Sequence, residues 1–342
     1  MTTGKRIPYL DLLKFLAIFL VLLGHSTEQT SADEFWDHPV WSFIYSFHMP
    51  LFMFLCGFFF LSSLKRPFLV MLRKKFIQLG IPSIMAFLIQ YVIMLLMGRH
   101  AIADLCERSF MGFMNAVWFL KCVFFCYVIM YPVCKLLKND ILSSAIAVLV
   151  ISLVPGADIV NLNFMLPFFC LGIIIANHKE QIQRHRLAWT IISCALFLIL
   201  LPLWSGRLTV YMVPTHILTF HPISLDFINL EITLFRLLIG MSGTLACYLL
   251  IQPVYGLIEH KRICPILLEI GGATLGIYFL QTFLLEILVN CLHVYIPIPW
   301  SYPAVFVLAV LELILCFLVV KLIRKNALLG LLLLGEQKPS HP

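Results

Sequence analysis

Long apolar runs are the feature that most constrains what this chain can fold into. Residues 12–23 and 308–320 are almost entirely apolar and lack the alternation of a transmembrane β-strand. About 20 such residues in a helix cross a bilayer. Since 61% of all residues are apolar and only 12% are charged, the composition excludes a soluble enzyme, a disordered chain and a nucleic-acid-binding module. The sequence predicts an all-α integral membrane protein.

Apolar windows separated by charged residues, Pro or Gly predict ten transmembrane helices in one membrane-embedded domain, 1–342. The predicted spans are about 7–26, 41–62, 76–97, 113–135, 141–157, 160–177, 187–205, 232–254, 266–292 and 302–323. With the N-terminus inside, most of the 24 Lys and Arg residues fall on the cytoplasmic side. We therefore expect both termini to be cytoplasmic, and outer loops over about 27–40, 98–112, 206–231 and 293–301.

Three ionisable residues, Asp11, Lys14 and His25, lie in the first predicted span. Such residues are expensive in hydrocarbon and persist mainly when they are paired or functional. At 100° per residue, Lys14 and His25 lie within about 20° of each other around the helix and about 16 Å apart along it, with Asp11 about 40° away. Considered separately, these residues have ordinary structural interpretations. Asp11 and Lys14 can form an i,i+3 ion pair, and His25 can be an interfacial histidine that is hydrogen-bonded to a loop carbonyl. Their common face favours a functional polar stripe.

A second histidine, His48, is predicted at a similar depth in the second span, two residues before Pro50. Proline cannot donate the helical hydrogen bond and frees a backbone carbonyl. Two facing histidines are suited to acid–base catalysis or to a proton relay. No metal site is predicted, because no carboxylate or third histidine shares their depth at ligand spacing.

A basic cluster, Arg73, Lys74 and Lys75, comes at the start of the third predicted span. One interpretation is a topology signal that binds the phosphates of membrane lipids. The other is a cytoplasmic binding site for a polyphosphate donor. The sequence alone leaves both interpretations open.

Two further acidic residues, Glu286 and Glu312, are predicted inside the last two spans. A buried carboxylate needs a partner, since an unpaired charge is strongly disfavoured in hydrocarbon. Lys14 and Lys121, which also lie within predicted spans, are the candidate partners. Which pairs form depends on how the helices pack.

Two N-terminal motifs together resemble the opening of the acyltransferase 3 family of integral membrane acyltransferases. The first is a basic residue, an Asp, Lys14, ten residues and His25, and the second is the aromatic-His-x-Pro-Leu-Phe stretch 47–52. Further similar stretches are 115–120, 167–172 and 271–281, so the resemblance covers almost the whole chain.

The chain departs from the family pattern at several positions. Lys14 stands where the family usually has Arg, which keeps the charge but loses bidentate geometry. Lys75 and Gln78 occupy the positions where many members carry two arginines before Ile-Pro. Gln281 replaces a histidine that often follows the Ile-Tyr pair.

The resemblance implies transfer of an acyl group, usually acetyl from acetyl-CoA, to a hydroxyl of a cell-surface carbohydrate or its lipid-linked precursor, in the bacterial inner membrane. The basic cluster then binds the phosphates of the acyl-CoA. His25 deprotonates the acceptor or carries the acyl group, and Lys14, held by Asp11, orients the donor or stabilises the oxyanion. The alternative is a transporter or exporter of polysaccharide or small molecules with the same fold.

Overall fold

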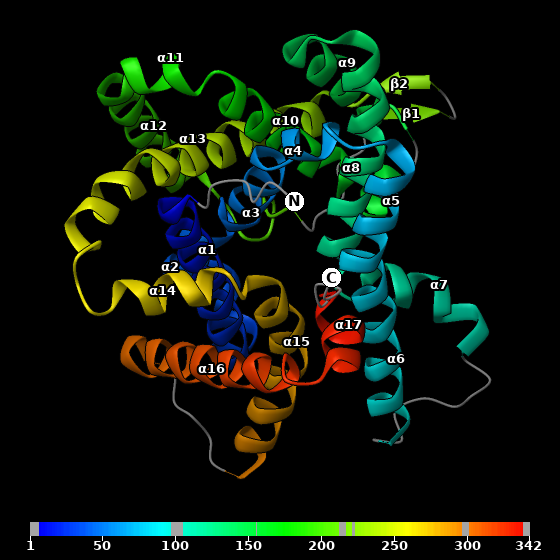
Figure 1. Ribbon diagram of the computed structural model, residues 1–342, viewed down its shortest axis with the longest axis vertical. Helices are drawn as coiled ribbons and strands as arrows, with labels where there is room; N and C mark the ends of the chain where they lie inside the picture. Colours follow the sequence, from blue (N-terminus) through cyan, green and yellow to red (C-terminus); the bar gives the residue numbers. More distant parts are fainter. Residues whose placement is uncertain are drawn as a thin grey trace, which may run out of the picture.

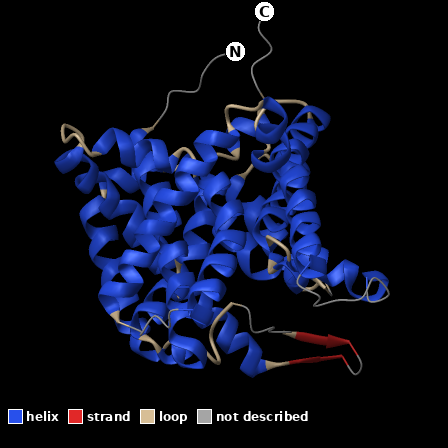
Figure 2. Cartoon of the chain, turned by 90° about the horizontal axis from the view of Figure 1, so that it is seen from below, coloured by secondary structure: helices blue, strands red, loops and turns tan. Residues whose placement is uncertain are grey.

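The computed structural model describes residues 7–96, 105–154, 156–211, 217–220, 223–295 and 301–337. These residues are almost wholly helical (Figure 1). The α-helices are α1 (Pro8–Ser31), α2 (Pro39–Tyr45), α3 (His48–Phe58), α4 (Leu61–Leu64), α5 (Phe68–Lys75), α6 (Ile81–Leu96), α7 (Leu105–Asn115), α8 (Trp118–Leu137), α9 (Asp140–Ser152), α10 (Leu162–Asn177), α11 (Lys179–Arg184), α12 (Arg186–Leu200), α13 (Phe227–Ile258), α14 (Cys264–Gly271), α15 (Thr274–Tyr295), α16 (Tyr302–Ile323) and α17 (Ala327–Leu334). An antiparallel hairpin of β1 (Leu218–Phe220) and β2 (Ile223–Leu225) projects from one end of the helical body (Figure 2).

Seven described helices or continuous helical segments are long and apolar enough to cross a membrane, and the bent pair α14–α15 raises the number to eight. The seven are Pro8–Thr30, Pro39–Leu64, Phe68–Ile93, Trp118–Leu137, Arg186–Leu203, Phe227–Ile258 and Tyr302–Ile323. The other two predicted spans correspond to α9 and α10, which are apolar but have only 13 and 16 residues. The all-α membrane fold is confirmed, while ten full spans and the side on which each terminus lies stay predictions.

The second predicted helix is broken next to its histidine. Residues 41–62 were expected to form one helix, but α2 ends at Tyr45 and α3 begins at His48. Phe47 between them has φ −148° and ψ −10°, outside the helical region. Pro50 explains the break, because its ring clashes with the carbonyl four residues earlier and its nitrogen carries no hydrogen. His48 is therefore the first residue of a new helix.

The third predicted helix begins earlier than expected, at Phe68 rather than at residue 76. The basic cluster forms the last turn of α5 and is followed by a π-helical turn, Phe76–Gly80, and then by α6. Pro82 cannot donate a hydrogen bond to this turn, which disturbs the regular ladder. The cluster thus lies within a continuous helical segment and not in the loop that precedes it.

The ninth predicted helix, 266–292, is two helices bent by 75° between α14 and α15. Gly271 ends α14 against the backbone of α1, where an added Cβ would lie 1.9 Å from the carbonyl oxygen of Asp11. Only glycine permits this approach. The bend and this contact place α14 directly beside the polar residues of α1.

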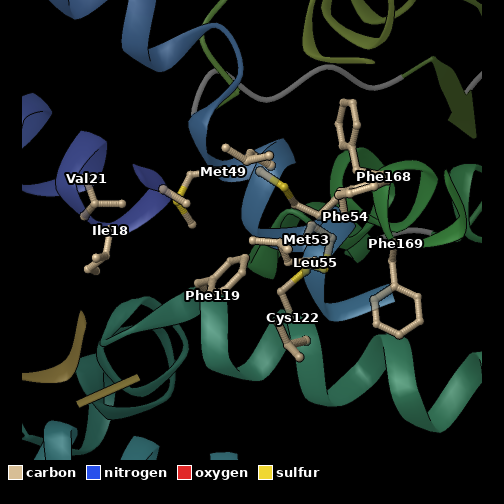
Figure 3. Close-up of a cluster of buried hydrophobic side chains, with 14 of the residues drawn as sticks. Ile18, Val21, Met49, Met53, Phe54, Leu55, Phe119, Cys122, Phe168 and Phe169 are labelled. Carbon is tan, nitrogen blue, oxygen red and sulfur yellow. The ribbon is translucent and has the colours of Figure 1, made fainter. Parts of the chain in front are cut away.

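Helix α1 lies inside the bundle and packs against α2, α3, α13, α14, α15 and α16. Helices α3 and α10 also pack closely in the core. An added Cβ would lie 1.9 Å from the carbonyl oxygen of Phe169 at Gly57, and 2.1 Å from that of Phe54 at Gly172. Figure 3 shows Phe54 and Phe169 in the apolar cluster that surrounds this crossing. Glycine at these two positions therefore allows the backbones of α3 and α10 to approach each other closely.

Candidate functional site

A hydrogen bond between the side chains of His25 and Glu28 lies in the last turns of α1. The distance from His25 Nδ1 to Glu28 Oε2 is 2.7 Å. Since a carboxylate only accepts hydrogen bonds, Nδ1 carries the proton and donates it. Among the described residues, nothing is hydrogen-bonded to Nε2, and the His25 side chain is 34% exposed. Nε2 is therefore left without a hydrogen-bond partner in the part of the chain that the structure describes.

The Glu28 carboxylate is held from its other side by two aromatic residues of α2. Trp41 Nε1 donates to Glu28 Oε1 at 3.0 Å, and the Tyr45 hydroxyl donates to the same oxygen. The rings of Trp41 and Tyr45 stack with centroids 4.0 Å apart. These contacts fix the carboxylate, and with it the orientation and the tautomer of His25.

Sequence reasoning missed Glu28, because it ended the first helix at residue 26 and assigned the acid to an outer loop. In the structure α1 continues to Ser31, so His25 and Glu28 stand at i and i+3 on one helix. This is the same spacing as that of Asp11 and Lys14, and it was the signal available in the sequence. The polar stripe of α1 is therefore longer than predicted.

His48 does not contact His25 directly. Its Nδ1 donates to the carbonyl oxygen of Ile44 at 2.9 Å, and the residue is 1% exposed. The ring of Tyr45 lies against both histidines, with centroid distances of 4.6 Å to His48 and 6.5 Å to His25. The structure thus brings the two predicted histidines to one aromatic residue rather than to each other.

Tyr211, from the segment between α12 and β1, is a second residue that sequence reasoning did not find. Its ring lies 6.1 Å from that of Tyr45 and 6.2 Å from that of His48, between centroids. Burial raises the pKa of Tyr211 well above its ordinary value, and the negative charge of Glu28 raises it further. The hydroxyl therefore stays protonated and can donate a hydrogen bond.

Lys14 and Asp11 form the predicted i,i+3 ion pair, with Nζ 3.0 Å from Oδ1. Asp11 is 6% exposed, while the Lys14 side chain is 26% exposed. The ammonium also lies over the ring of Phe59, 4.5 Å from its centroid. Lys14 is thus held in place and keeps an accessible edge.

The structure divides the basic cluster. Lys75 is half-buried, donates to Gln78 Oε1 at 3.2 Å and lies 3.9 Å from the centroid of the Tyr127 ring. Arg73 and Lys74 are exposed. Only Lys75 of the three therefore faces the interior of the bundle.

Lys14 and Lys75 converge from different helices. Lys14 lies over Phe59, just after α3, and Lys75 lies over Tyr127, whose hydroxyl donates to the carbonyl oxygen of Cys56 in α3 at 3.2 Å. The site consequently has two parts along α1, a lysine end at Lys14 and Lys75 and a histidine end at His25. The helical rise from Lys14 to His25 separates them by about 16 Å.

Glu312 pairs with neither candidate lysine in the described part of the chain, since Lys14 pairs with Asp11. Lys121 instead donates to the carbonyl oxygen of Ala116. Both carboxylate oxygens of Glu312 are buried without a hydrogen-bond partner in the described part of the chain. The side chain of Glu286 lies outside the described residues.

Comparison with known proteins places these observations in a family. A family model described as an acyltransferase domain, acyltransferase 3, matches residues 7–321. Similar proteins include Nodulation protein NolL of Sinorhizobium fredii, 29% identical over 191 residues, which are 52% of this chain and 51% of the relative. Nodulation protein NolL of Mesorhizobium japonicum is 24% identical over 185 residues, 51% and 49% of the two chains. The chain spans about half the length of these curated relatives, and no solved structure matches it.

Proposed function

Because the chain belongs to the acyltransferase 3 family, we propose that it transfers an acyl group from acyl-CoA, with acetyl-CoA as the expected donor, to a hydroxyl of a cell-surface carbohydrate or its lipid-linked precursor. The motifs at 6–25 and 47–52 pointed to this family, and the match over 7–321 confirms it. The observation that carries the proposal is the His25–Glu28 pair with a free Nε2 edge. Such a pair is a general base that is ready to act on a hydroxyl.

The proposed reaction uses His25 as the base. Nε2 takes the proton of the acceptor hydroxyl while the hydroxyl oxygen attacks the thioester carbonyl. The tetrahedral intermediate then breaks its C–S bond, and the imidazolium returns the proton to the leaving CoA thiolate. Glu28 stabilises the imidazolium that exists between the two steps, because its carboxylate lies 2.7 Å from Nδ1.

The lysine end is the proposed donor site. Lys75 and Lys14 supply positive charge to the phosphates and the thioester arm of CoA, and Asp11 orients Lys14. Arg73 and Lys74 extend this charge to the protein surface. We propose a bacterial inner membrane as the location, with the donor entering from the cytoplasm and reaching His25 along α1.

The reaction is tested by acetyl-CoA turnover. Purified protein in nanodiscs is mixed with acetyl-CoA and a panel of methyl glycosides, and release of CoA is measured with a thiol reagent. Release that requires both protein and glycoside supports the proposal. No glycoside-dependent release from folded protein with any acyl-CoA would contradict it.

Replacing Lys75 by Gln is expected to weaken acetyl-CoA binding about tenfold, because a half-buried charge is poorly screened. The matched control is Arg73→Gln, which removes an exposed charge and is expected to have a smaller effect that disappears at high salt. Isothermal titration calorimetry with acetyl-CoA at low and high salt measures both variants. Equal losses in both variants would show that the interior position of Lys75 has no special role.

Replacing Glu28 by Gln is expected to lower kcat about 10²–10³-fold with little change in the KM of either substrate. The amide preserves size, but its NH₂ group facing Nδ1 favours the wrong imidazole tautomer, and the charge that stabilises the imidazolium is lost. Glu180→Gln, at an exposed position in α11, is the control. A normal kcat in Glu28→Gln would remove Glu28 from the mechanism.

A further inference from the structure

Two aromatic residues, Trp118 and Tyr211, form a wall beside the histidine end of the site. Their ring centroids are 5.6 Å apart, and the Tyr211 ring lies 6.2 Å from that of His48. Phe164 of α10 continues the wall, with its ring nearly parallel to that of Tyr211 at 6.3 Å. Trp118 is half-buried and Tyr211 is 8% exposed. The proposed reaction assigns no role to either residue.

A buried arginine fixes the segment that carries Tyr211. Arg236 of α13 is 2% exposed, and it donates from Nε to the carbonyl oxygen of Thr209 at 2.9 Å and from Nη2 to that of Leu208 at 3.1 Å. A guanidinium inside a membrane helix is unfavourable unless its donors are satisfied. Here the backbone just before Tyr211 satisfies two of them, so this segment is anchored to the bundle.

The backbone that carries Trp118 is fixed in a similar way. Val117 has φ 43° and ψ 46°, a left-handed conformation that is unfavourable for a β-branched residue. The buried ammonium of Lys121 donates to the carbonyl oxygen of Ala116, on the other side of this strained residue. Strained residues that the surrounding structure maintains are typical of functional sites.

We propose that Trp118 and Tyr211 are the residues that bind the sugar ring of the acceptor. This inference rests on the proposed function and assigns acceptor-binding residues to the same site. A pyranose has an apolar face of C–H groups and a rim of hydroxyls. Trp118 offers an aromatic face to the C–H groups, and the Tyr211 hydroxyl donates to a ring hydroxyl. The sugar bound in this way presents a second hydroxyl to Nε2 of His25.

Steady-state kinetics separate the acceptor from the donor. In Trp118→Ala and Tyr211→Ala the KM of a methyl glycoside is expected to rise about tenfold or more, while the KM of acetyl-CoA is unchanged. Trp189→Ala, which truncates an exposed tryptophan of α12, is the matched control and should equal the wild type. Conservative Tyr211→Phe should lose only part of the affinity, because the ring remains. An unchanged glycoside KM, or equal rises for both substrates, would overturn the proposal.

A direct binding measurement tests the role of the aromatic wall independently of catalysis. Saturation-transfer difference NMR with methyl glycosides is expected to detect binding to the wild type and to His25→Ala, and weaker binding to Trp118→Ala. If the wild type binds glycoside in a Trp118-dependent way but releases no CoA, the proposed acyltransferase activity is refuted and the glycoside-binding role of the wall is retained. If no methyl glycoside binds in a Trp118-dependent way, the wall does not bind the acceptor, whatever the outcome of the CoA assay.

Discussion

The variant His25→Ala is expected to lose acceptor-dependent release of CoA by about 10²–10⁴-fold, the usual contribution of a positioned general base. The side chain is 34% exposed, and its Nδ1 is already bonded to Glu28. Removing it deletes the free Nε2 edge and leaves the packing of α1 largely intact. Turnover of acetyl-CoA by purified protein in nanodiscs measures the loss.

The control for this prediction is His48→Ala. His48 donates Nδ1 to the backbone of Ile44 and has no bond to Glu28, so we expect a smaller loss of rate together with some loss of stability. Melting temperatures of both variants separate folding from chemistry. Wild-type turnover by His25→Ala would show that His25 is not the base. Movement of a saccharide across liposomes without consumption of a thioester would favour the transporter instead.

Gly57→Ala is expected to destabilise the protein by about 3 kcal/mol or more, the upper range for overpacking. The added Cβ would lie 1.9 Å from the carbonyl oxygen of Phe169, a backbone atom that cannot rotate away. Gly172→Ala places a Cβ 2.1 Å from the carbonyl oxygen of Phe54 at the same crossing and should act similarly. Thermal unfolding in detergent measures both effects.

Gly256→Ala is the matched control, because it also lies in a helix but has no atom within 4 Å of the added Cβ. Replacing a helical glycine by alanine without a clash is expected to stabilise by up to about 1 kcal/mol. The two kinds of variant should therefore shift the melting temperature in opposite directions. Equal melting temperatures of Gly57→Ala and Gly256→Ala would mean that α3 and α10 can move apart to admit the added Cβ without a loss of stability.

The signals that the sequence carried correctly are local ones. Continuous apolar runs predicted the membrane helices, since about 20 such residues are needed to cross hydrocarbon. The i,i+3 spacing of Asp11 and Lys14 predicted an ion pair, which the structure forms. Both signals depend on residues within one helix, where geometry follows from the 3.6-residue turn.

The sequence by itself thus determined the class of fold, the family and the polar stripe from Asp11 to His25. The tertiary structure decided which side chains meet that stripe. The i,i+3 spacing places Glu28 beside His25, but its carboxylate is held in position because α2 folds back and supplies Trp41 and Tyr45. Lys75 reaches the α3 side of the site because α5 packs against α8, whose Tyr127 contacts both Lys75 and the carbonyl oxygen of Cys56. The segment carrying Tyr211 is held there by Arg236. These contacts join residues far apart in the chain, and no spacing within one helix encodes how separate helices pack.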